Sequence, residues 1–250
     1  MRPAARDVLD GVVDLFLPKR CVVCGAAGSW LCRQCGAGLV PLDGPRCGHC
    51  GSPSGVAVAE CRECRARRLG FVSARAAFSY QGPARRLVTA CKFRALRSLA
   101  REMADLAAPH FPRALPGACG PAAPQAVTAV PAHRGHRLER GFNQAELLGR
   151  ELARAADLPF VDLLVRTRHG RRQSELAADE RCANVRGAFG AAPVARRVAG
   201  ELKRVVIVDD VYTTGETLSE CSKALVVVGC EPHVFTFARA VRVVPDAAKL

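Results

Sequence analysis

Val205-Val206-Ile207-Val208-Asp209-Asp210-Val211-Tyr212-Thr213-Thr214-Gly215-Glu216-Thr217-Leu218 is the stretch that decides the fold. Its first four residues are β-branched, which is typical of a strand buried on both faces of a parallel sheet. Two carboxylates follow at the carboxyl end of that strand, where doubly wound sheets place their ligands. A hydroxyl-rich turn with one glycine then opens a helix. The stretch predicts a strand, an acidic pair, a binding turn and a helix, in that order.

The turn at 213–217 suits a phosphate group, and the acidic pair before it suits a sugar. Backbone N–H groups and the dipole at the start of a helix favour an anion, and threonine hydroxyls add donors. The two carboxylates would repel a phosphate, but they accept hydrogen bonds from the 2′- and 3′-hydroxyls of a ribose. We therefore expect the ribose 5-phosphate group of a ligand such as 5-phosphoribosyl 1-pyrophosphate (PRPP) to bind here. The binding segment comprises Asp209, Asp210, Val211, Tyr212, Thr213, Thr214, Gly215, Glu216 and Thr217.

Other phosphate-binding motifs fit this stretch less well. Gly215 lacks the G-K-[ST] spacing of a P-loop, and G-x-G-x-x-G occurs at none of the expected strand ends. The acidic pair alone would be an ordinary strand end, and T-T-G alone would be a helix cap. Their succession after a β-branched strand favours a ligand site.

Strand and helix patterns alternate around this stretch. We expect strands at 71–80, 126–130, 160–165, 204–208 and 233–239, and helices at 83–95, 97–108, 143–156, 174–184 and 214–228. Such alternation predicts an α/β fold, with a parallel sheet and helices on both faces. The residues at 112–125 are rich in Pro, Gly and Ala and predict a loop. We expect one domain over 71–242, with its core at 126–240.

Two basic segments follow expected strands. The first, at 130–145, offers candidate pyrophosphate ligands, and the second, at 166–174, could close over the site and exclude water. Solvated loops, or a nucleic-acid contact for the second segment, are the alternatives. The candidate residues are His133, Arg137, Arg140, Arg168 and Arg172.

Eight cysteines form four C-x-x-C pairs within 21–66, and they predict bound metal. Four thiolates per ion suit a structural Zn²⁺. A double zinc ribbon is the expectation, while interleaved pairing or a single zinc stays open; His49 is a less favoured ligand. Because such cysteines stay reduced inside cells, we expect a cytoplasmic protein. The eight ligands are Cys21, Cys24, Cys32, Cys35, Cys47, Cys50, Cys61 and Cys64.

The rest of the composition limits the partners. Acidic residues interrupt the apolar pattern of residues 1–20, so we expect a lead-in helix rather than a secretion signal, and we expect no membrane span. The formal charge is +14, and residues 71–250 hold 27 basic and 17 acidic side chains. This excess favours a nucleotide or a nucleic acid as partner. With one Trp, two Tyr and ten Phe, a base-stacking platform for single strands is disfavoured.

The acidic pair and turn resemble the PRPP-binding motif of type I phosphoribosyltransferases, from which Glu216 departs because a small residue is common there. The resemblance extends through CKFRALRSLA (91–100), VPAHRGHRLERGFNQA (130–145), RTRHGRRQSELAADERCANVRGAF (166–189) and VVIVDDVYTTGETL (205–218), which together are similar to the ComF/GntX family. This likeness implies a type I phosphoribosyltransferase-like twisted parallel sheet with flanking helices behind a cysteine module. It also implies a role in natural competence, DNA uptake or the processing of incoming single-stranded DNA, alongside other DNA-uptake or recombination proteins.

Two functions follow from this sequence. In the first, the protein is an enzyme that binds Mg²⁺–PRPP, expels pyrophosphate and transfers the ribosyl phosphate to an unknown acceptor. Asp209 and Asp210 would then be the catalytic residues that hold the ribose. In the second, the protein keeps the PRPP pocket as a sensor, or binds single-stranded DNA, without catalysis.

Overall fold

The computed structural model describes residues 19–94, 97–111, 123–133, 135, 141–167, 185–198 and 200–241. Several predictions from the sequence fall outside this part of the chain. They concern nearly all of the lead-in helix at 1–20 and the helix at 174–184. Four candidate arginines also lie outside the described residues: Arg137, Arg140, Arg168 and Arg172.

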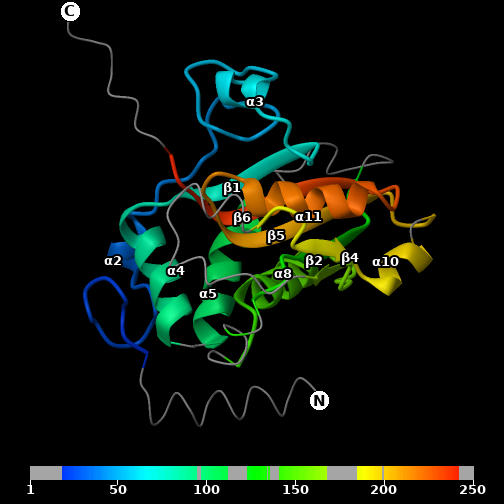
Figure 1. Cartoon of the computed structure of the whole chain (residues 1–250). Coiled ribbons are helices and arrows are strands. Elements are labelled where there is room, and N and C mark those ends of the chain that lie inside the picture. Colours follow the sequence, from blue (N-terminus) through cyan, green and yellow to red (C-terminus); the bar gives the residue numbers. More distant parts are fainter. Residues whose placement is uncertain are drawn as a thin grey trace, which may run out of the picture.

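Four parallel strands form the central sheet, in the order β1 (Ser73–Ser79), β6 (Glu231–Arg239), β5 (Arg204–Tyr212) and β2 (Ala126–Ala129) (Figure 1). The side chains of 205–208 are fully buried and divide between two cores, alternate residues facing opposite sides of the sheet. A β-branched run buried on both faces is what a central parallel strand requires. The predicted α/β class is therefore confirmed.

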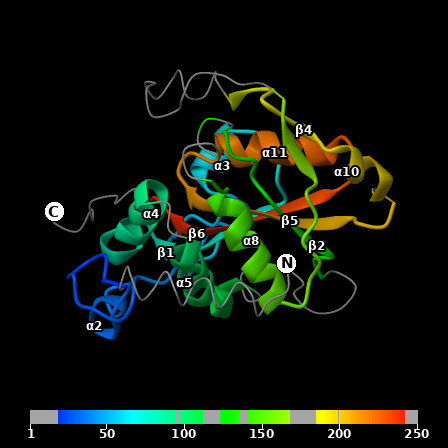
Figure 2. The same cartoon turned by 90° about the horizontal axis from the view of Figure 1, so that it is seen from below.

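Helices cover both faces of this sheet (Figures 1 and 2). One core contains residues of α4 (Gly82–Arg94), α5 (Arg97–Ala107) and α8 (Gln144–Ala155), and the other contains residues of α11 (Glu216–Val226). The helix α8 follows β2 and α11 follows β5, so two neighbouring strands send their chains to opposite faces. Doubly wound sheets bind ligands at such a switch point, at the carboxyl ends of the strands.

A short antiparallel pair lies beside α11. It consists of β3 (Leu164–Arg166) and β4 (Phe189–Ala191), and it is followed by α10 (Pro193–Val198). The sequence pattern predicted a strand at 160–165, but Phe160 makes only an isolated bridge, to Val127. It did not predict β4 or α10, since three- and six-residue elements are too short to show a period.

The strand β5 extends four residues beyond its predicted end, because β6 continues beside it. The ladder runs from Arg204 opposite Glu231 to Tyr212 opposite Arg239, so both aspartates lie within it rather than after it. The helix α11 begins at Glu216, later than the predicted 214, because Gly215 has a left-handed conformation with a φ of 78°.

The edge strand β1 is covered by residues 40–42, which lie between the first four and the last four of the C-x-x-C cysteines. The Leu42 N–H donates to the Ala77 carbonyl at 3.0 Å, and the Ser79 N–H donates to the Val40 carbonyl at 2.8 Å. An uncovered edge strand would expose unpaired N–H and C=O groups. The cysteine module therefore continues the hydrogen bonding of the sheet. The described residues also form the short helices α2 (Arg33–Gly36), α3 (Arg62–Ala66) and η1 (Ala108–His110).

Candidate functional site

The candidate site lies at the carboxyl end of β2, where β5 extends beyond its pairing with β2. The pairing of β2 with β5 ends at Ala129 and Val208, and the Val130 N–H donates to the Val208 carbonyl at 3.0 Å. From Asp209 onward β5 continues along β6 alone, within the described residues. The segment after β2 consequently starts beside Asp209, at the switch point.

Asp210 faces the α4–α5–α8 side of the sheet. Its Oδ2 lies 3.0 Å from the Lys92 Nζ, and only 13% of the Asp210 side chain is exposed. Burial acts to lower the pKa of Lys92, but the Asp210 carboxylate outweighs it and raises that pKa. Asp210 also borders a cavity of about 10 Å³, enough for about one water, lined by Val88, Cys91, Ala100, Met103, Gln144 and Leu148.

Asp209 projects to the opposite face, because side chains alternate along a strand. Its Oδ1 accepts a hydrogen bond of 2.8 Å from the Asp210 N–H. Burial, and then the charge of Asp210, raise the pKa of Asp209 to about 7. The two acids thus have different surroundings: Asp210 is paired with Lys92, while Asp209 is desolvated on the other face of the sheet.

The turn itself requires glycine at 215. A Cβ on Gly215 would lie 2.4 Å from the Tyr212 Oη, and the φ of 78° is one that other residues rarely adopt. The Ser219 N–H donates to the Gly215 carbonyl at 2.8 Å and begins α11. Thr213 and Thr214 are exposed, so their hydroxyls are accessible to a ligand.

Tyr212 forms the buried floor of this turn. Its ring packs edge-on against Phe71, with the ring centroids 6.2 Å apart. The Arg239 guanidinium carbon lies 4.0 Å from the Tyr212 ring centroid. Burial raises the pKa of Tyr212 to about 12, so the phenol stays neutral. Tyr212 is therefore a support beneath the turn, with its side chain turned into the protein.

Glu216, the departure from the phosphoribosyltransferase motif, is paired. Its Oε1 accepts a hydrogen bond from the Arg67 Nη2, just after the second cysteine cluster. This guanidinium offsets the negative charge that Glu216 would otherwise present to a phosphate. Glu216 and Thr217 are both partly exposed at the start of α11.

The two basic segments are described in part. The His133 Nδ1 accepts a 3.2 Å hydrogen bond from the Gly135 N–H, just beyond β2. Asn143 donates to the Val130 carbonyl at 2.9 Å and so ties the far end of the first segment to the end of β2. The second segment begins at the end of β3, where the Thr167 N–H donates to the Ala188 carbonyl at 2.9 Å.

Lys92 is the residue of this site that the sequence analysis did not single out. It lies on α4, more than 100 residues before its partner Asp210, so no local spacing connects the two. The available signal was the similarity of residues 91–100 to the ComF/GntX family, a stretch in which Lys92 is the only lysine.

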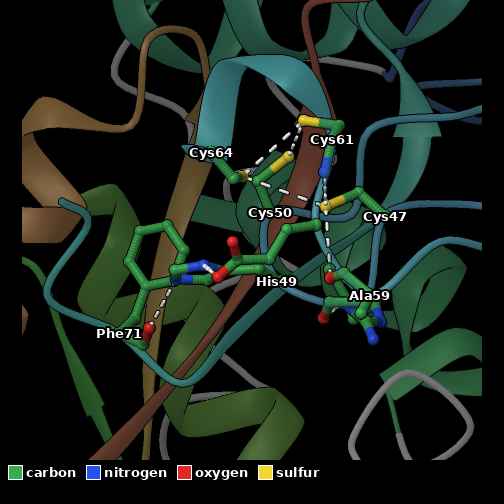
Figure 3. Close-up of polar contacts among 10 residues, drawn as sticks. Cys47, His49, Cys50, Ala59, Cys61, Cys64 and Phe71 are labelled. Carbon is green, nitrogen blue, oxygen red and sulfur yellow. Dashed lines mark hydrogen bonds and ion pairs between the residues drawn. The ribbon is translucent and has the colours of Figure 1, made fainter. Parts of the chain in front are cut away.

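The cysteines gather into two sequential sets of four. Within each set, all the Sγ atoms lie within 4.8 Å of one another. The first set is Cys21, Cys24, Cys32 and Cys35, and the second is Cys47, Cys50, Cys61 and Cys64 (Figure 3). The interleaved pairing left open by the sequence is therefore wrong. We call these sets the first and the second cluster.

Both clusters have the dimensions of a zinc site. A tetrahedral ion with Zn–S bonds of 2.3 Å separates its sulfurs by about 3.8 Å. The Sγ–Sγ distances include 3.7 Å for Cys24–Cys32, 3.7 Å for Cys50–Cys61 and 3.9 Å for Cys47–Cys64. Four convergent thiols, with no carboxylate in either set, suit a structural Zn²⁺.

Backbone N–H groups complete each metal-binding knuckle. Gly25 and Gly51, directly after Cys24 and Cys50, have φ values of 79° and 72°, which turn the chain back toward the sulfurs. Gly36 instead ends the helix α2. The Cys61 N–H lies 3.2 Å from the Cys47 Sγ. His49 stays outside the cluster, with its Nε2 at 2.8 Å from the Phe71 carbonyl (Figure 3).

Comparison with known proteins places this architecture in a family. Competence protein F of Haemophilus influenzae is 32% identical to this chain over 239 residues, which cover 90% of this chain and 99% of the relative. The chain belongs to the competence protein F family. The ComF/GntX resemblance is thereby confirmed. DNA utilization protein YhgH of Escherichia coli K12 is 29% identical over 217 residues, or 84% of this chain and 92% of that relative.

Both parts of this competence protein F family member have a known architecture. Residues 12–65 match the family model named double zinc ribbon domain. The larger part is a parallel sheet with flanking helices, the architecture that the resemblance to type I phosphoribosyltransferases implied. Adenine phosphoribosyltransferase from Leishmania tarentolae shows a partial likeness, with a TM-score of 0.32 and 18% identity over 57% of this chain and 58% of that one. Among the described residues, no helix has the length and apolar character needed to cross a bilayer.

We expect this competence protein F relative to contain two zinc ions per chain, one for each cluster. The substitutions Cys24→Ser and Cys64→Ser should each remove about one ion, because a tetrahedral thiolate site closes only with four ligands. Elemental analysis of protein purified without oxygen measures this directly. A single ion in the intact protein would contradict the assignment of two sites.

Gly215→Ala should abolish binding of ribose 5-phosphate, because the new methyl group would displace either the turn or Tyr212. Gly229→Ala is the matched control, since Gly229 has a φ of 87° but open space around its Cβ position. Gly229→Ala should lower the free energy of unfolding by about 1–2 kcal/mol through backbone strain, and Gly215→Ala should lower it further because of the added collision with Tyr212. Only Gly215→Ala should affect calorimetric titration, and unchanged binding in that variant would count against the turn.

Proposed function

We propose that the protein binds PRPP, or a related ribose 5-phosphate, at the switch point between β2 and β5. The observation that carries this proposal is the turn at 213–217. It follows an acidic pair on the central strand, has an obligatory glycine, and opens α11 with exposed threonines. A helix start of this kind favours a dianion, and the acids beside it suit a diol.

Each part of the site has a proposed role. The 5-phosphate would lie on the turn, and Asp209 and Asp210 would reach the ribose hydroxyls from the two faces of the strand end. Lys92 would neutralise the charge of Asp210 until the sugar binds, so that no unpaired carboxylate is left at the end of the strand. The pyrophosphate, with its Mg²⁺, would face the basic segments that carry His133, Arg137, Arg140, Arg168 and Arg172.

The relatives suggest the setting in which this pocket works. One is named a competence protein and another a DNA utilization protein. We therefore propose a cytoplasmic role in the uptake or processing of incoming single-stranded DNA, together with other DNA-uptake or recombination proteins. The basic excess of residues 71–250 supports a phosphate-rich partner.

The pocket supports either of two modes of action. As a transferase, the protein would break the bond between the ribose C1 and the pyrophosphate oxygen and form a new bond from C1 to an acceptor. Pyrophosphate leaves with the electron pair, and a base takes the proton of the acceptor. As a binding protein, it would hold PRPP or a DNA end without turnover. Release of pyrophosphate when a nucleobase, ammonia or DNA is supplied as acceptor would indicate a transferase.

Asp209→Asn and Asp210→Asn should each weaken the binding of Mg²⁺–PRPP at least about tenfold, because a hydrogen bond to a charged group contributes about 1.5–3 kcal/mol. Isothermal titration calorimetry measures the effect. Asp105→Asn is a suitable control, since Asp105 is exposed on α5. Equal affinities for the intact protein and both site variants would exclude this pocket.

Single-stranded DNA should bind mainly through its phosphates. The logarithm of the association constant should fall linearly with the logarithm of the salt concentration, with a slope of about −0.7 for each phosphate contacted. Fluorescence anisotropy with a labelled oligonucleotide at several NaCl concentrations gives this slope. An affinity that does not change with salt would rule out this mode of contact.

A further inference from the structure

The second cluster contacts the strand end that carries the phosphate turn. Arg239, at the end of β6, is 5% exposed and donates from Nη1 to the Cys50 carbonyl at 2.6 Å. Its Nη2 lies 3.6 Å from the Cys50 Sγ, one of the four thiols that fit a zinc ion. The same guanidinium stacks on the Tyr212 ring at 4.0 Å. One buried side chain therefore touches a metal ligand and the floor of the turn.

Tyr212 connects Arg239 to the turn, because it lies between the two. Its hydroxyl occupies the space that a Cβ on Gly215 would enter, so the ring sets how closely the turn approaches β5. Tyr212 and Arg239 are register partners in the β5–β6 ladder, and the Ala240 N–H donates to the Tyr212 carbonyl at 2.9 Å. A shift of the Arg239 guanidinium would therefore move the Tyr212 ring, which lies beneath Gly215.

A second contact joins the same cluster to the other end of the turn. Arg67 follows α3, whose Cys64 is a ligand of the second cluster, and it pairs with Glu216. The Gly70 N–H also donates to the Ser219 Oγ at 3.0 Å, within the first turn of α11. The second cluster therefore holds the phosphate turn from below through Arg239 and from the side through Arg67.

The first cluster contacts a different part of the molecule. It packs on α5, where the Glu102 carboxylate accepts hydrogen bonds from the N–H groups of Trp30 at 3.3 Å and Leu31 at 2.7 Å. The Trp30 Nε1 donates to the Ser98 Oγ at 3.1 Å. Figure 1 shows the same separation, with α2 beside α4 and α3 on the other side of the sheet. Within the described residues, the second cluster is the one that contacts the turn.

We propose that Arg239 is a positioning residue that couples the metal in the second cluster to the phosphate turn, so that zinc there and ribose 5-phosphate on the turn strengthen each other's binding. The coupling rests on the function proposed above. Because such coupling is reciprocal, the factor by which zinc raises ribose 5-phosphate affinity must equal the factor by which ribose 5-phosphate raises zinc affinity. Coupling through global unfolding would protect both zinc ions alike, whereas coupling through Arg239 protects only the ion in the second cluster.

The substitution Arg239→Lys tests the link. Lysine keeps the charge but cannot form the planar fork that binds Cys50 and stacks on Tyr212 together. We expect two zinc ions per chain to remain and ribose 5-phosphate affinity to fall about tenfold, within the range usual for coupled sites. Arg75→Lys is the matched control. Arg75 donates to the Gly48 carbonyl at 2.8 Å, so it also contacts the second ribbon, but from β1.

Zinc release supplies a measurement that needs no substitution at Arg239. A chromogenic chelator is added to the intact protein with and without ribose 5-phosphate, which requires no Mg²⁺. We expect the sugar phosphate to slow the release of one of the two ions. Cys24→Ser, which retains the second cluster, should keep the protected ion, and Arg239→Lys should lose the protection.

The outcomes separate the two proposals. If the intact protein does not bind ribose 5-phosphate or PRPP, the assigned site falls and the coupling falls with it. If the intact protein binds ribose 5-phosphate but releases zinc equally fast with and without it, the assigned site stands and the coupling is wrong. Equal ribose 5-phosphate affinities for Arg239→Lys, Arg75→Lys and the intact protein would likewise overturn the role of Arg239.

Discussion

The parallel ladder between β5 and β6 is the constraint on which the rest of this structure depends. Its register sets Tyr212 opposite Arg239 and Asp209 opposite Thr236. Because side chains alternate along a strand, a slip of one residue would turn each of them to the wrong face. The ladder thus fixes the acids, the floor of the turn and the arginine that meets the second cluster in a single step.

The cysteine module depends on metal because its sequence is poorly suited to forming a hydrophobic core of its own. The segment from 21 to 64 has few large apolar side chains, and its order comes from eight convergent thiols. Each cluster joins one of the two hydrophobic cores of the larger domain, and polar contacts add to this packing: Glu102 at the first cluster, and Arg75 and Arg239 at the second. Arginine serves these contacts well, because its fork can satisfy a buried carbonyl while its flat face stacks on a ring.

The sequence predicted those features that depend on neighbouring residues. The β-branched run at 205–208, the acidic pair and the C-x-x-C spacing each carry a local signal, and the sheet, the turn and the two clusters followed from them. Features that depend on partners distant in the chain did not follow. The true end of β5 depends on β6, the pairing of Asp210 depends on Lys92, and the neutralisation of Glu216 depends on Arg67. Nothing in the local pattern around Arg239 distinguishes it from a strand-end arginine.

The covering of β1 has a consequence for the order of synthesis. The partner of β1 in the sheet is β6, and the pairing of Ser73 with His233 spans 160 residues. Ribosomes make the N-terminal part first, so β1 emerges long before its neighbour exists. The segment joining the two ribbons is already present by then, and it hydrogen-bonds to one edge of β1 through Val40 and Leu42. The joining segment can therefore cover one of the two edges of β1 during synthesis, so that only the edge facing β6 still lacks a partner.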